Sequence, residues 1–341
     1  MLEAVQTPAG TQRAHETVAP MLLALAGLLA CSIAFATAAR AQDAPANLSL
    51  AGKRIGITVI GTDHDWDLKA YQGQIDTVKQ LGGTPIALDA GRKDEQQIAQ
   101  IQTLIAQKPD AIIEQLGNVK VLNPWLKKIR DAGIPLFTVD TATPYAINNT
   151  TSNNYAIGSD IALQMVSDIG GKGNILVFNG FYSVPVCKIR YDQMKYVLES
   201  FPEVKLIQPE LRDVIPNTVQ SAYAQVTDML TKYPEKGSIS AIWACWDVPQ
   251  VGATQALQAA GRTEIRTYGI DGSPEFVAMV ADPSSPAAAV AVQRPYEIGQ
   301  TAAQNVARHL TGEKVPPFNF VSHVLLTKAN AKKVVPTLNL K

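Results

Sequence analysis

The sequence lacks a net charge, because 30 lysines and arginines balance 30 aspartates and glutamates among its 341 residues. This balance argues against a large nucleic-acid footprint, which requires an excess of basic residues on one surface. Aromatic residues are also few, at 6%, although 46% of the residues are hydrophobic. This is the composition of a folded globular protein, and the length favours two domains over one.

Motifs for nucleophilic catalysis and for phosphate binding are missing as well. The sequence contains neither a GxSxG elbow nor a glycine-rich loop that ends in Gly-Lys-Ser or Gly-Lys-Thr. The glycines at 170–173 precede a predicted strand, which is typical of the end of a helix. No spacing of carboxylates singles out the acid pair of a glycosidase. We therefore predict no catalytic residues and no cofactor.

Residues 61–67, GTDHDWD, contain alternating aspartates that resemble the start of a calcium-binding loop. Such a loop needs glycine at its sixth position and glutamate at its twelfth, where this sequence has Leu68 and Gln74. The histidines His309 and His323 lie far along the chain without the spacing of zinc ligands. The sequence therefore predicts no metal site.

The N-terminal segment reads as a secretory signal peptide. Residues 21–39 are apolar, and Ala39-Arg40-Ala41 offers a cleavage site of the A-x-A type. The alternative of a membrane anchor is disfavoured by the small residues that follow the apolar run and by the lack of cationic flanks. Residues 28–31 resemble a lipoprotein box, but the apolar run continues past Cys31. We expect an exported, periplasmic protein that is cleaved near Ala41; lipidation at Cys31 and the true start codon stay open.

Cysteine is scarce, since only Cys187 and Cys245 remain after residue 41. An oxidising compartment permits a disulfide between them, and two buried thiols are the alternative. Neither cysteine belongs to a CxxC or zinc-binding pattern.

From Lys53 onward, short apolar runs alternate with amphipathic helical patterns. Continuous apolar runs predict strands whose two faces are both covered by helices, as in a parallel sheet. The predicted strands are 54–61, 84–89, 110–115, 135–140, 174–180, 204–209, 238–246, 266–271 and 287–293. The predicted helices are 67–83, 94–108, 125–132, 155–169, 188–201, 216–232, 248–260, a short helix from 274, and 295–312. This alternation predicts doubly wound α/β structure.

A polar segment, 141–154, contains a proline and has no hydrophobic period, which predicts a crossing between two domains. The same winding restarts after it. We therefore expect two α/β lobes of similar size, with the helix at 295–312 returning to the first lobe to complete its helical layer.

Ligands of open α/β sheets bind beyond the carboxyl ends of the strands. Carboxylates and amides exchange hydrogen bonds with hydroxyl groups, and flat rings cover the C–H faces of a carbon skeleton. The side chains at these ends therefore favour a neutral polyhydroxylated ligand, although an aspartate there can also cap a helix and a tryptophan can be core. The candidates are His64, Trp66, Asp67, Gln115, Asp140, Phe181, Trp246, Asp271 and Gln293, with Arg190 one turn into a helix.

The motifs YGIDGSPE, D-x-x-x-x-GA from Asp247, and Val139-Asp140 resemble those of periplasmic ribose-binding-protein-like sugar receptors. The resemblance covers about residues 52 to 330. It implies a type I periplasmic binding protein, in which two doubly wound parallel-sheet lobes are joined by a three-segment hinge. The family binds a sugar between the lobes and presents it to an ATP-driven membrane importer. The implied parts are a signal peptide at 1–41, an N-terminal lobe of 52–152 plus 294–321, and a C-terminal lobe of 153–293 plus 322–341.

The resemblance also implies roles for single residues. Asp140 and Asp271 match hydroxyl acceptors from opposite lobes, Arg190 matches a cleft arginine, and Gln293 matches an amide near a crossing. Trp66 matches a stacking aromatic residue. His64 and Gln115 stand where asparagines usually bond hydroxyls.

This sequence departs from the family pattern at three positions. Asp67 takes the place of a second stacking ring, Thr141 that of an arginine, and Trp246 that of a hydrogen-bonding asparagine. A ribose site would thereby lose stacking in the first lobe and gain a ring in the second. We therefore expect a small sugar or polyol other than ribose, with Trp246 as the apolar wall.

Three other functions compete with import. A transcription repressor with the same fold would carry an N-terminal helix-turn-helix, where this chain has an export signal. An exported sugar-processing enzyme would need a catalytic motif. A receptor for a chemotaxis or sensor-kinase partner would have the same fold and cleft, so the sequence leaves it open. We expect a monomer whose partner is an inner-membrane ABC permease, with no nucleic acid.

Overall fold

The computed structural model describes residues 48–179 and 184–338. The predicted signal peptide, Cys31 and Phe181 lie outside these ranges. Within them, no helix is both long enough and apolar enough to cross a bilayer.

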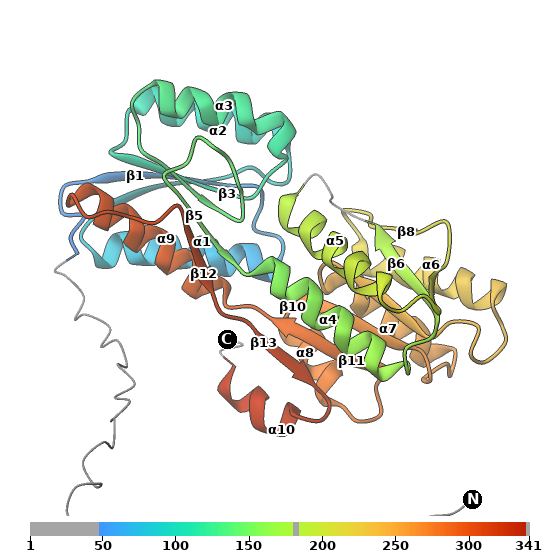
Figure 1. The fold of residues 1–341 in the computed structure, drawn as a ribbon. Coiled ribbons are helices and arrows are strands. Elements are labelled where there is room, and N and C mark those ends of the chain that lie inside the picture. The colour runs from blue at the N-terminus through green and yellow to red at the C-terminus, as the bar shows by residue number, and fades with distance from the viewer. Residues whose placement is uncertain (1–47, 180–183, 339–341) are drawn as a thin grey trace, which may run out of the picture. The chain divides into compact units, whose positions relative to one another are not determined.

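The first sheet is parallel throughout and, within the described residues, has six strands in the order β12-β5-β4-β3-β1-β2. Helices α1 (Asp65–Gln80) and α9 (Pro295–Leu310) cover one face, and α2 (Asp94–Gln107) and α3 (Val119–Asp131) cover the other (Figure 1). The strands are β1 (Arg54–Val59), β2 (Thr84–Asp89), β3 (Ala111–Gln115), β4 (Leu136–Val139), β5 (Asn148–Ser152) and β12 (Phe318–Val321).

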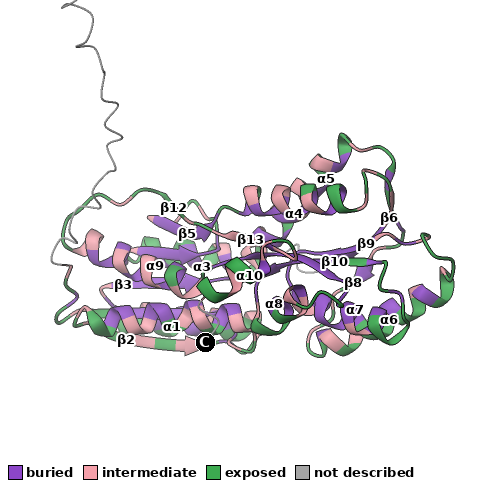
Figure 2. Cartoon of the chain, turned by 90° about the horizontal axis from the view of Figure 1, so that it is seen from below, coloured by how far each residue is buried: buried purple, intermediate pink, exposed green. Residues whose placement is uncertain are grey.

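The second sheet has the order β13-β11-β10-β9-β6-β7, and β8 pairs with β6 beside that path. Its strands are β6 (Gly173–Asn179), β7 (Val204–Leu206), β8 (Leu211–Arg212), β9 (Ala241–Ala244), β10 (Arg266–Asp271), β11 (Ala287–Val292) and β13 (Val324–Thr327). Its helices are α4 (Asn154–Asp168) and α5 (Pro185–Glu199) on one face, and α6 (Thr218–Lys232), α7 (Val248–Ala259) and α8 (Pro274–Ala281) on the other. The strands form the buried interior between these layers (Figure 2). The short helices α10 (Ala331–Val334) and η1 (Val335–Thr337) follow β13.

The chain passes between the two sheets after β5, after β11 and after β12. The predicted fold class, two doubly wound lobes with three connections, is therefore confirmed. One strand departs from it, because β13 pairs with β11 in the antiparallel sense. The residue boundaries of the lobes stay a prediction.

Helix α9 does return to the first sheet, where its backbone closely approaches that of α1 at two glycines. A Cβ atom on Gly299 would lie 2.0 Å from the carbonyl oxygen of Ala70, and one on Gly73 would lie 2.3 Å from that of Tyr296. Glycine is therefore required at both positions for this close approach. The contact fixes the helix whose first turn carries Trp66 and Asp67.

The chain does cross between the sheets within 141–154, but the segment also contains strand β5, which was not predicted. Its sequence, NNTTS, is polar, yet all its residues are buried. The side chains find partners inside the sheet: Asn148 Nδ2 donates to the carbonyl of Pro316 at 2.8 Å, and Thr138 Oγ1 donates to Asn149 Oδ1 at 3.2 Å. Hydrophobic periodicity does not detect a strand whose buried face is satisfied by amides.

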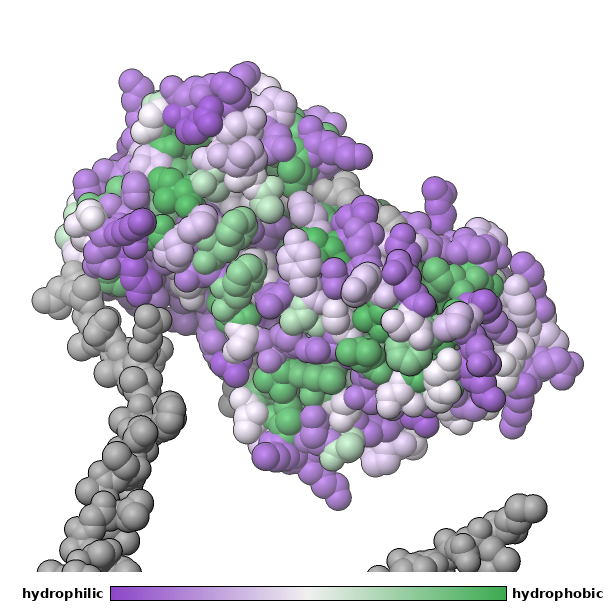
Figure 3. Space-filling view, viewed as in Figure 1, coloured by the Kyte–Doolittle hydropathy of each residue, from purple (hydrophilic) through white to green (hydrophobic). Residues whose placement is uncertain are grey.

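The surface is mixed in character. On the face seen in Figure 3, hydrophobic residues lie in separate patches among hydrophilic ones. Phe318 and Phe320 of β12 are exposed, and their rings stack with centroids 6.2 Å apart.

Candidate ligand-binding site

A cavity of about 60 Å³, which we call the inner cavity, lies where the carboxyl ends of strands from both sheets meet. Most of the candidates chosen from the sequence line it, although they are scattered over more than 200 residues of chain. These are His64, Trp66, Asp67, Asp140, Arg190, Trp246 and Asp271. Of the remaining described candidates, Gln293 lines an adjoining cavity and Gln115 lines neither.

His64 reaches from the first sheet toward two carboxylates of the second. It is the N-cap residue of α1, and its side chain is only 10% exposed. Its Nε2 lies 3.8 Å from Asp247 Oδ1 and 4.0 Å from Asp271 Oδ2, and has no hydrogen-bond partner among the described residues. Burial alone would lower the pKa of His64, but these carboxylates and that of Asp67 raise it to about 9. The ring is therefore an imidazolium at neutral pH.

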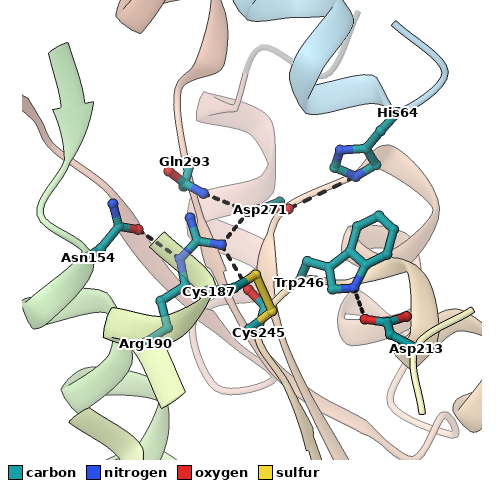
Figure 4. The surroundings of a disulfide bond; sticks show 9 residues. All are labelled: His64, Asn154, Cys187, Arg190, Asp213, Cys245, Trp246, Asp271 and Gln293. Atoms are coloured by element: carbon teal, nitrogen blue, oxygen red, sulfur yellow. Dashed lines mark hydrogen bonds and ion pairs between the residues drawn. A yellow bond between two sulfur atoms is a disulfide. The ribbon is translucent and has the colours of Figure 1, made fainter. Parts of the chain in front are cut away.

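Asp271, at the end of β10, is held by two residues of the second lobe (Figure 4). Its Oδ1 accepts hydrogen bonds from Arg190 Nη1 at 3.2 Å and from Gln293 Nε2 at 2.6 Å. Burial raises the pKa of Asp271 to about 7, against the lowering effect of Arg190 and His64. Oδ2 faces His64. One oxygen of this carboxylate is therefore bound by Arg190 and Gln293, and the other is turned toward the first sheet.

Asp247 has a similar division of its two oxygens. Oδ2 accepts from the backbone N–H groups of Gly272 and Ser273, at 3.0 and 2.6 Å, which fixes the turn after β10. Oδ1 is buried and has no hydrogen-bond partner among the described residues. A buried oxygen of this kind costs free energy unless something outside the chain donates to it.

His64, Asp247 and Asp271 form a convergent trio, with one ligand atom of each within 4.8 Å of the others. A hydroxyl group can accept from the imidazolium and donate to a carboxylate at the same time. Imidazole and carboxylates also ligate divalent cations. The sequence-based expectation of no metal stays a prediction, while the mixed donor and acceptor character suits hydroxyl groups.

Arg190 of α5 lines the inner cavity and is 2% exposed. Its Nε donates to Asn154 Oδ1 at 2.7 Å and its Nη1 to the carbonyl oxygen of Cys245 at 2.8 Å. Cys187 and Cys245 form a disulfide with Cα atoms 5.2 Å apart, which resolves the alternative left open by the sequence. The disulfide ties the first turn of α5 to the end of β9, beside the Arg190 guanidinium (Figure 4).

Trp246 forms an aromatic wall opposite the first sheet. Its ring meets that of His64 edge to face, with centroids 5.1 Å apart and planes at 74°. Its indole N–H donates to the carboxylate of Asp213, a residue that the sequence did not single out (Figure 4). Burial raises the pKa of Asp213 to about 6, although the bond from Trp246 opposes this. Asp213 thus fixes how the ring lies.

Two more aspartates come from the first sheet. Asp140 has a positive φ of 55°, and its Oδ1 accepts from the hydroxyl of Thr151. Burial raises the pKa of Asp140 to about 6, while Arg190 lowers it. Asp67 is paired with Arg92, which the sequence did not single out either. Arg92 follows the carboxyl end of β2, so the strand-end argument would have found it had that strand been included.

Gln115 lies behind the inner cavity rather than in its lining. It is fully buried, its Nε2 donates to the carbonyl oxygen of Asp67 at 2.9 Å, and its Oε1 accepts from Gln74 at 2.5 Å. Both ends of the amide are therefore committed to α1. Gln115 thus positions the first turn of that helix, and the hydroxyl contact that the resemblance implies stays a prediction.

Comparison with known proteins shows the family to which the chain belongs. Residues 55–314 match the family described as the periplasmic binding protein domain. The chain belongs to this family. A subunit of an ABC sugar transporter from Rhodobacter sphaeroides 2.4.1 is 78% identical, with a TM-score of 0.82 over 83% of this chain and 100% of that one.

Two further binding proteins are similar to the chain. An ABC transporter solute-binding protein from Agrobacterium vitis, solved with bound allitol, is 61% identical, with a TM-score of 0.83 over 84% of this chain and 99% of that one. A xylitol-binding protein from Mycolicibacterium smegmatis is 28% identical over 69% of this chain and 66% of its own length.

Proposed function

We propose that the chain captures a small polyol or sugar in the inner cavity and delivers it to the permease of an ABC importer. The observation that carries this proposal is the meeting of His64 Nε2 with the open oxygens of Asp247 and Asp271. His64 Nε2 and Asp247 Oδ1 are buried and lack hydrogen-bond partners among the described residues, and Asp271 Oδ2 faces His64 at 4.0 Å. A neutral ligand with several hydroxyl groups satisfies all of them without bringing in a charge.

The similarity to the allitol-bound protein favours a polyol among these ligands. The ligand residues that we propose are His64, Trp66, Asp67, Asp140, Arg190, Trp246 and Asp271, which line the inner cavity. Gln293 acts through Asp271, to which it donates. Phe181 belongs to the same proposal, but lies outside the described residues.

The mechanism needs no bond to be made or broken. Groups of the first sheet and groups of the second sheet reach the ligand from opposite sides. A ligand that contacts both sets stabilises the closed arrangement of the lobes over an open one. We propose a binding protein and not an enzyme, which acts in the periplasm after removal of residues 1–41.

A thermal-shift screen against a library of sugars and polyols tests this function. We expect allitol or a related polyol to raise the melting temperature, since a ligand at roughly 100 times its Kd adds about 2.7 kcal/mol of stability. Recovery of the ligand unchanged after incubation is expected of a binding protein. The absence of a shift with every member of the library would refute the proposal.

A further inference from the structure

A second cavity, of about 240 Å³, adjoins the inner cavity on the side of α1 and the turn before α6, and we call it the outer cavity. Asn217 and Gln220 line it from the second lobe, and Asp63 lines it from the first. The side chains that line both cavities are those of His64, Arg92, Ile215 and Trp246. These four residues therefore stand between the two spaces.

Arg92 is the member of this partition that is most firmly held in place. Its backbone has a positive φ of 62°, and its N–H donates to the carbonyl oxygen of Ile60 at 2.6 Å. Its Nε donates to Asp63 Oδ1 at 2.7 Å, and its Nη2 donates to Asp67. The neighbouring Gly61 leaves room for it, because a Cβ atom there would lie 2.9 Å from Arg92 Cγ.

One nitrogen of the guanidinium remains for a ligand. Arginine carries five N–H donors in a rigid fork, and two of them belong to Nη1. Among the described residues, no hydrogen bond or ion pair involves Arg92 Nη1. The side chain is 19% exposed, and Arg92 lines both cavities.

We propose that Arg92 is a ligand-contacting residue that selects for open-chain polyols long enough to reach it. The inference rests on the proposed function and deepens it. His64 Nε2 and Asp271 Oδ2, whose residues line the inner cavity, bind hydroxyl groups of the ligand. Arg92, which lines both cavities, donates through Nη1 to a hydroxyl farther along the ligand.

The Asp67–Arg92 pair also argues for an open chain over a ring. A pyranose presents an apolar C–H face, which an aromatic ring covers well. On the side of the first sheet the inner cavity presents an ion pair at this point, and ionised groups are best satisfied by hydroxyls. An open-chain polyol carries hydroxyl groups along its whole length, and so it has one for His64 and Asp271 and another for Arg92.

Titration calorimetry with glycerol, erythritol, ribitol and allitol tests this inference. We expect the affinity of the wild-type protein to rise with chain length. Arg92→Lys keeps a cation beside Asp67 but loses the planar fork. It should weaken allitol binding roughly 10-fold or more, as expected for one charge-assisted hydrogen bond, and leave erythritol within about 2-fold. Arg130→Lys, on the exposed side of α3, is the matched control.

A second variant addresses the loss of the buried ion pair itself. Asp67→Asn with Arg92→Gln removes both buried charges together, so that only the exposed carboxylate of Asp63 loses its partner. It should show the same selective loss for the longer polyols. Equal losses for all four ligands, or no loss with either variant, would overturn the role of Arg92 while leaving the proposed function in place. If the wild-type protein bound none of the four, both proposals would fail.

Discussion

Asp271→Ala is expected to weaken the binding of allitol by roughly 100-fold or more. Truncating one member of a buried, hydrogen-bonded charge pair typically costs about 2–5 kcal/mol. Here the change removes the acceptor of Arg190 Nη1 and of Gln293 Nε2, and also the oxygen that faces His64. Titration calorimetry of the purified variant measures the loss directly.

Two further variants separate this effect from a general disturbance. Asp271→Asn keeps the shape and one acceptor oxygen, and we expect it to retain part of the affinity. Glu275→Ala removes an exposed carboxylate from the first turn of α8, away from the inner cavity, and should bind like the wild-type protein. Wild-type affinity in Asp271→Ala would show that the ligand binds elsewhere.

The second large effect concerns pH. The pKa of His64 is 6.5 in a model peptide and about 9 in the folded protein. The groups that face its ring are Asp67 of α1, Asp247 at the start of α7, Asp271 of β10 and the edge of Trp246. Between these two pKa values the folded protein holds a proton that the unfolded chain releases. The stabilisation by His64 is therefore complete below pH 6.5 and is lost as the pH rises through 9.

The size of this effect follows from the shift in pKa and is roughly 3 kcal/mol. Urea denaturation of the wild-type protein and of His64→Asn at about pH 6, 7.5 and 9 measures it. Burial raises the pKa of Glu114 to about 8, which lowers stability over part of the same range, but Glu114 is common to both proteins. The advantage of the wild-type protein should shrink as the pH rises, and parallel curves for the two proteins would contradict the charge assignment.

The residues at the ends of predicted strands were the part of the site that was easiest to predict from the sequence. Parallel strands end at the same edge of a sheet, so His64, Asp140, Trp246 and Asp271 could be grouped from the sequence before any contact was known. The lobes and the return of α9 followed from the alternation of strands and helices. These inferences needed only local patterns and the rules of doubly wound folds.

The parts that escaped prediction depend on contacts between distant residues. Arg92 pairs with Asp67, 25 positions away in the sequence, and Trp246 pairs with Asp213, 33 positions away. Neither pairing produces a periodic pattern in the sequence. Gln115 stands at a strand end as predicted, but the sequence does not reveal that its amide turns onto α1. Strand β5 escaped because its buried side chains are amides and hydroxyls.

A crystal structure of the protein with allitol would test the central claim, capture of a neutral polyol between the two lobes, most directly. We predict one allitol molecule in the inner cavity, with hydroxyl oxygens within hydrogen-bonding distance of His64 Nε2 and Asp271 Oδ2. Allitol bound away from both groups, or contacting one lobe alone, would contradict the account.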